Sequence, residues 1–184
     1  SRFERSTAVP AGECAYYNLI LLARDLEGYH NLAFIASKAF TDGFYYKPRI
    51  DAEIVAEHSG GLIGLSGGMS GPVGHFLANG NADQALENAK AIENILGAGN
   101  FFLEINEGVN ENSKKLLADT VELGKMAGIP LVATNDVHYL NKEDARAQEL
   151  LVCIGEGRTI GEHSRTETAT KYLKSAEEMW DIFG

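Results

Sequence analysis

Short apolar runs alternate with longer amphipathic segments along this chain, and this pattern leaves few possible folds. Four runs have the length and composition of buried strands: Tyr16 to Ala23, Gly61 to Ser66, Phe101 to Asn106 and Leu131 to Thr134. The segments between them are helix-like and have about ten residues or more, the length that a crossover connection needs. This order predicts parallel crossovers, and hence an α/β sheet or part of a barrel. Four strands cannot close a barrel by themselves.

Capping residues and helical spacing define the predicted helices. They are Glu27 to Asp42, a short helix from the N-cap Asp51 to His58, Val73 to Ala78, Ala82 to Leu96, Asn110 to Ala127, a helix that starts at Asn141, and one behind the capping box Ser175 to Glu178. The Asn141 helix carries an apolar face. Gly67 to Pro72 lacks the lysine of a phosphate-binding loop, so we interpret it as a strand-to-helix turn.

Composition excludes several classes of protein. The chain has 184 residues, 45% of them hydrophobic, which is enough for one core of ordinary size. The formal net charge of −10 repels phosphate backbones, so direct duplex binding is not expected. Cys14 and Cys153 have no metal-binding spacing, which favours a reducing cytoplasm. No apolar run approaches the roughly 20 residues of a membrane span.

Polar side chains follow the last predicted strand. Asp136 and His138 are two residues apart, so in an extended chain both point to the same face at the carboxyl end of the strand. Folds of the α/β class place their chemistry there. A carboxylate beside an imidazole can share a metal ion or act as an acid/base pair. The alternative is an ordinary polar strand end.

Other polar residues invite weaker hypotheses. Glu104 lies among apolar neighbours, so its carboxylate must be paired, hydrogen-bonded or near the open strand end. The aromatic and basic loop Tyr45 to Arg49 either contacts a partner or nucleic acid, or packs on its own domain. The remaining histidines fit helical or loop positions better than a metal site: His30, His58, His75 and His163.

Seven blocks of sequence, in order and at ordinary spacing, resemble one family. They are Asn18 to Asp25, Gly28 to Leu32, Gly43 to Asp51, Gly61 to Gly68, Val132 to Tyr139, Glu143 to Ala147 and Tyr172 to Met179. Together they are similar to the polymerase-and-histidinol-phosphatase (PHP) domain of the bacterial DNA polymerase III alpha subunit. The resemblance implies a distorted parallel, TIM-like (β/α) barrel whose amino-terminal strands are missing from this chain. It assigns residues 16–184 to a partial PHP domain and residues 1–15 to a tail or loop.

The resemblance also implies that the family's metal site is degenerate in this chain. Asn18 stands where metal-binding members have His, and Gly68 stands where they have Cys. Asp136 and His138 match family ligands residue by residue, while Glu104 and Glu107 are additional candidates. No catalytic residue is assigned. If the full-length domain held a metal, zinc, magnesium or manganese would be expected.

The function implied by the resemblance is that of a structural and interaction module in a replicative DNA polymerase of the cytoplasm. Its expected partners are the rest of the polymerase alpha chain and the proofreading exonuclease subunit, with DNA reached only through the parent polymerase. The polymerase carboxylates belong to regions outside this chain. The alternative is a metal-dependent phosphoesterase or proofreading exonuclease activity at the PHP site, to which Glu104, Glu107 and His75 could supply replacement ligands.

Overall fold

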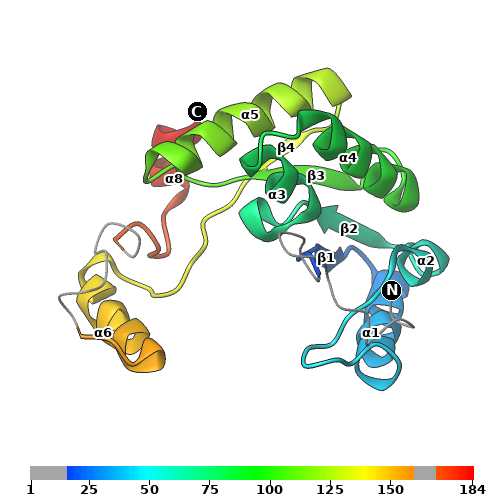
Figure 1. Ribbon diagram of the computed structural model, residues 1–184, viewed down its shortest axis with the longest axis horizontal. Coiled ribbons are helices and arrows are strands. Elements are labelled where there is room, and N and C mark those ends of the chain that lie inside the picture. Colours follow the sequence, from blue (N-terminus) through cyan, green and yellow to red (C-terminus); the bar gives the residue numbers. More distant parts are fainter. Residues whose placement is uncertain (1–15, 160–168) are drawn as a thin grey trace. The chain divides into compact units, whose positions relative to one another are not determined.

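The computed structural model describes residues 16–159 and 169–184 (Figure 1). The strands are β1 (Ile20–Ala23), β2 (Leu62–Leu65), β3 (Phe101–Ile105) and β4 (Leu131–Ala133). The α-helices are α1 (Leu26–Thr41), α2 (Ala52–Glu57), α3 (Pro72–Ala78), α4 (Ala82–Leu96), α5 (Glu111–Ala127), α6 (Ala145–Glu156) and α8 (Ala176–Phe183). Short 3-10 helices, η1 (Gly68–Ser70) and η2 (Lys142–Asp144), precede α3 and α6. The predicted tail, residues 1–15, lies outside the described residues.

Side-chain caps fix where several helices begin. The backbone N–H groups near each start would lack partners, and a side-chain oxygen one residue before the helix accepts from one of them. Asp51 accepts from Ile54 N–H at 3.2 Å, as its predicted role requires. Ser175 and Glu178 form the predicted reciprocal capping box ahead of α8. The helices α2 and α8 therefore begin where the sequence predicts, whereas the helix predicted to start at Asn141 begins at Ala145, after η2.

The four strands form one mixed sheet in the order β1-β2-β3-β4. The pairing of β2 with β3 is parallel, as predicted. Leu103 N–H donates to Pro130 O at 2.9 Å and Thr134 N–H donates to Ile105 O at 3.0 Å, so both chains run in the same direction at β3 and β4.

The prediction of parallel crossovers throughout is wrong at β1. This strand pairs antiparallel with β2, with Ile20 opposite Leu65 and Ala23 opposite Leu62. The long connection through α1 and α2 does not fix the direction in which the chain returns. An antiparallel strand at the edge of an otherwise parallel sheet is common in α/β proteins.

The chain divides into two compact units, which we describe separately. Among the described residues, the first comprises residues 16–104 and Thr120–Val132. The second comprises Ile105–Asp119, residues 133–159 and residues 169–184.

The first unit contains the apolar core. Its largest fully buried side chains come from β2, β3 and α3: Phe101, Leu62, Leu103 and Val73. The helices α3 and α4 pack side by side (Figure 1), and α4 also contacts β2. Burial of these side chains is the main source of stability in this unit.

The second unit is built mainly from polar contacts. Residues 138–139 pair with residues 171–173: His138 N–H donates to Lys171 O at 2.8 Å, and Leu173 N–H donates to Tyr139 O at 3.0 Å. On α6, Arg146 donates to the buried Glu149 at 2.8 Å. The apolar face predicted for this helix is largely exposed, since Leu151 and Ile154 both face solvent. Among the described residues, no helix has the length and apolar character to cross a bilayer.

Candidate functional site

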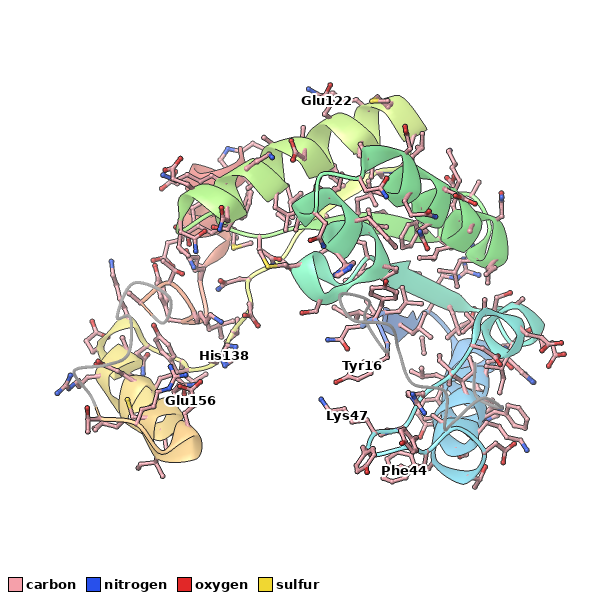
Figure 2. The ribbon with its side chains drawn as sticks, in the orientation of Figure 1. Tyr16, Phe44, Lys47, Glu122, His138 and Glu156 are labelled. Atoms are coloured by element: carbon pink, nitrogen blue, oxygen red, sulfur yellow. The ribbon has the colours of Figure 1, made fainter. Side chains whose placement is uncertain are left out.

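Asp136 and His138 meet on the segment between β4 and η2 (His138 is labelled in Figure 2). Asp136 Oδ1 lies 3.1 Å from His138 Nε2. Both side chains are largely exposed, at 62% for Asp136 and 40% for His138. An exposed pair of this kind can orient an imidazole, but water screens it, so it contributes little to stability.

A lysine donates a hydrogen bond to the second carboxylate oxygen of Asp136. Lys171 Nζ donates to Asp136 Oδ2 at 2.8 Å. Burial by itself would raise the pKa of the Asp136 carboxyl, but the hydrogen bond and charge of Lys171, with those of His138, outweigh it and hold this pKa below its ordinary value of 3.8. Asp136 is therefore ionised at neutral pH with a partner at each oxygen.

Glu107 is also paired with a lysine. Its Oε2 lies 3.1 Å from Lys174 Nζ, whose side chain is only 3% exposed. Lys174 donates its hydrogen bonds to Asn135 Oδ1 at 3.0 Å and to the carbonyl oxygen of Thr170. The same ammonium lies 4.8 Å from the centre of the Tyr172 ring. Lys174 thus ties together segments that are far apart in the sequence.

Tyr172 links this cluster to α8. Its hydroxyl donates to Glu178 Oε1 at 2.7 Å, while its carbonyl oxygen accepts from Asn135 Nδ2 at 2.5 Å. The hydrogen bond to Glu178, followed by burial, raises the pKa of the phenol. Sequence reasoning missed Lys171 and Lys174 as partners of the candidate ligands. The only signal in the sequence was a pair of lysines ahead of a capping box in an acidic chain.

This donor set does not fit a catalytic metal ion. Zinc sites of enzymes use about three protein ligands and leave one position open, and magnesium requires carboxylate oxygens that are free to face it. Within residues 16–159 and 169–184, no group of three or more His, Cys, Asp or Glu side chains gathers to hold a metal ion. The carboxylates of Asp136 and Glu107 instead face ammonium groups.

Asn18 and Gly68, at the expected lost ligand positions, belong to the first unit. Asn18 N–H donates to Ser70 O at 2.9 Å, so the chain before β1 lies against the glycine-rich turn after β2. A Cβ atom on Gly67 would lie 2.2 Å from Asn18 O. Gly68 has φ 55°, where a side chain is unfavourable. The turn leads from β2 through η1 into α3, as predicted.

Glu104 belongs to the first unit, whereas Glu107 belongs to the second. The backbone N–H of Glu104 donates to Ser66 Oγ at 2.9 Å. The residue is half-buried within β3 and makes further interactions there.

The other described histidines lie on helices among rings or at the surface. His75 on α3 packs 5.3 Å from the Tyr17 ring, measured between centroids. His58 ends α2 and lies 4.2 Å from the Phe34 ring. His30 is exposed on α1. His163 lies outside the described residues.

The aromatic and basic loop packs on itself only in part. Arg49 lies 5.0 Å from the centre of the Tyr45 ring, and Lys47 Nζ lies 5.2 Å from that of Tyr16. Tyr16 and Lys47 approach one another in Figure 2. Tyr46 is 85% exposed, and its ring meets the Tyr45 ring edge-on, with 4.8 Å between the ring centres.

Comparison with known proteins gives the chain a family. The model of the PHP domain family matches residues 3–108, more than half of the chain. Curated relatives named DNA polymerase III subunit alpha include those of Treponema pallidum, 40% identical over 100% of this chain, and Thermus aquaticus, 41% identical over 97%. The relative from Deinococcus radiodurans is 40% identical over 97% of this chain.

The chain spans only about a sixth of the length of these relatives: 16%, 15% and 13%, in the same order. The match nevertheless begins near the start of the chain and includes β1, β2, β3 and the glycine-rich turn. This chain belongs to the PHP domain family.

Proposed function

We propose that this chain is the PHP-domain region of a bacterial replicative polymerase, the DNA polymerase III alpha subunit, and that it serves as a structural and interaction module. Its relatives under that name cover nearly the whole chain at about 40% identity. The sheet is then one part of the family's TIM-like barrel, and the rest of the alpha chain is its partner. The protein works in the cytoplasm.

One observation carries the non-catalytic role: each candidate carboxylate of the second unit already has a lysine partner. A metal-dependent hydrolase needs carboxylates that face the ion and a metal-bound water of lowered pKa. Asp136 has one oxygen on His138 and the other on Lys171. A domain arranged in this way stabilises its surroundings and presents surface to partners, including the proofreading exonuclease.

One observation supports a second function. Asp136 and His138 are side by side, the arrangement in which a carboxylate orients an imidazole for acid/base chemistry. The alternative activity is hydrolysis of a phosphoester, or of a DNA 3′ end, at this pair. It would need further ligands from outside the described residues.

Both functions can be tested on the purified full-length protein to which this domain belongs. We expect primer extension with deoxynucleotides, and release of phosphate or nucleotide that is the same for the wild-type protein and Asp136→Asn, with magnesium, manganese or zinc added. A hydrolytic activity that depends on metal and disappears in Asp136→Asn would establish the alternative. Absence of primer extension would refute the polymerase assignment.

The exonuclease partnership needs its own measurement. The full-length protein should co-elute with the proofreading exonuclease subunit in size-exclusion chromatography, and a version that lacks residues 1–184 should not. Equal co-elution of both proteins would show that the exonuclease binds elsewhere.

A further inference from the structure

We propose that Lys171 and Lys174 are built-in cations that take the place of divalent metal ions in the second unit, so that Asp136 and His138 form a latent metal site closed by Lys171. This inference deepens the proposed function, on which it rests, because it gives the physical reason why the module needs no metal.

The surroundings of Lys174 are those of a bound cation. An ammonium group has three N–H donors and no acceptor. Lys174 Nζ donates hydrogen bonds to the amide oxygen of Asn135 at 3.0 Å and to the carbonyl oxygen of Thr170, and it forms an ion pair with the carboxylate of Glu107 at 3.1 Å. Carboxylate, amide and backbone carbonyl oxygens are the ligands that calcium and magnesium ions take in proteins. The ammonium therefore supplies a single positive charge where a hard cation could otherwise lie.

Burial separates Lys174 from an incidental surface pair. Exposed lysine-carboxylate pairs are common and contribute little, because water competes for both groups. The side chain of Lys174 is 3% exposed, and its ammonium also faces the Tyr172 ring. Removal of a partner from a charge that has lost its water is costly. Lys174 is thus a fixed part of the structure.

Lys171 is held by its backbone as well as by its side chain. Its carbonyl oxygen accepts from His138 N–H at 2.8 Å, which keeps residue 171 beside the Asp136 to His138 stretch. Its ammonium then reaches Asp136 Oδ2 at 2.8 Å. A divalent ion bound by Asp136 and His138 would lie within a few ångströms of this ammonium, and like charges at that separation repel by about 2 kcal/mol even in water.

The test uses the full-length protein and Mn²⁺ as the probe, with free Mn²⁺ measured by electron paramagnetic resonance. The variants are Lys171→Met, Lys171→Arg and the double variant Lys171→Met with Lys174→Met. Lys115→Met is the matched control, because Lys115 is an exposed lysine of the same unit and its loss changes the net charge equally. Each protein is also measured with Asp136→Asn added.

We expect Lys171→Met to bind Mn²⁺ at one site that neither wild type nor the Lys115→Met control shows, and to lose this site when Asp136→Asn is added. Lys171→Arg should behave as wild type. Lys171 is partly exposed, so the single variant remains informative if the double variant does not fold. Equal Mn²⁺ binding by Lys171→Met and Lys115→Met would overturn the inference.

Loss of Mn²⁺ from the wild-type protein on Asp136→Asn would also overturn it, because a metal would then bind while the lysines are in place. Primer extension by the same preparations reports separately on the proposed function. A protein that extends primers but gains no site in Lys171→Met refutes the inference alone.

Discussion

The two units of the chain are stabilised by different means. The first buries large apolar side chains such as Phe101 and Leu103, which are completely inaccessible to solvent. In the described part of the second unit, Cys153 is the one buried hydrophobic residue, and Glu149, four residues before it on α6, is also buried. The side chain of Lys174 is buried there beside Glu107 and Asn135.

This difference predicts different sensitivities. Apolar burial is non-directional and nearly independent of pH and salt, whereas ion pairs depend on both. The first unit should therefore respond to loss of volume, and the second to loss of charge. Amide hydrogen exchange of the full-length protein can report on each unit separately, since it measures local opening free energies.

Phe101→Ala should have the largest effect. Removal of a fully buried ring leaves a cavity, and we expect a loss of about 3–5 kcal/mol in the protection of β3 amides. Leu151→Ala, at a side chain that is 64% exposed, is the control and should cost less than about 0.5 kcal/mol. Equal losses for the two variants would remove the distinction between the units.

Gly67→Ala should have the next largest effect, a loss of about 3 kcal/mol in the protection of β1 and β2 amides. Gly67 and Gly80 have similar φ angles, 78° and 74°, so an alanine at either carries a similar left-handed penalty of about 1 kcal/mol. A Cβ on Gly67 would collide with Asn18 O at 2.2 Å, whereas nothing lies within 4 Å of one on Gly80. The excess cost of Gly67→Ala over Gly80→Ala, read from exchange of β1 and β2 amides, measures this contact. If there is no excess, the chain at Asn18 is not tightly held.

Lys174→Met should destabilise the second unit by about 2 kcal/mol, because it leaves Glu107 and Asn135 without their cation. Glu107 is 32% exposed, so water recovers part of the loss. Lys115→Met serves again as the control of equal charge and should have no measurable effect. The readout is exchange of amides 170–178. An unchanged protection pattern would mean that this unit has another source of stability.

The smallest expected effect is a change in how the stability of the second unit depends on pH in acid. The pKa of Asp136 is lowered in the folded state, so its stabilising contribution is complete above the ordinary value of 3.8 and is lost as the pH falls through the folded pKa. Lys171→Met removes the main favourable partner and should make the second unit less dependent on pH below about 4. Exchange measured between pH 6 and pH 3 would test this. A steeper loss of protection in acid for the variant would contradict the role of Lys171 in lowering this pKa.

Local signals in the sequence were enough to predict most of the helices and strands. Asp51 and Ser175 predicted helix starts because a cap depends on residues within one turn. The helix predicted at Ala82 to Leu96 has the observed bounds of α4. Family membership could also be predicted, because the seven short blocks, taken together, are specific for the PHP domain family.

Contacts between residues that are far apart in the sequence were harder to predict. The direction of β1 depends on how a long connection returns to the sheet, and nothing within β1 encodes it. Lys171 lies 35 residues from Asp136, so their ion pair left no trace in local spacing. The candidate ligands could therefore be found from the sequence, but the cations that face them could not. The metal-site assignments of Glu104, Glu107, Asp136 and His138 remain predictions.

The backbone at Tyr46 has an energetic consequence for its loop. Tyr46 is the one non-glycine with positive φ among residues 16–159 and 169–184, at φ 58°, a conformation that costs a tyrosine about 1–2 kcal/mol. Glycine would form the same bend without that penalty. Tyr46→Gly should therefore make the bend more stable, and it removes an exposed aromatic ring from the surface of the loop.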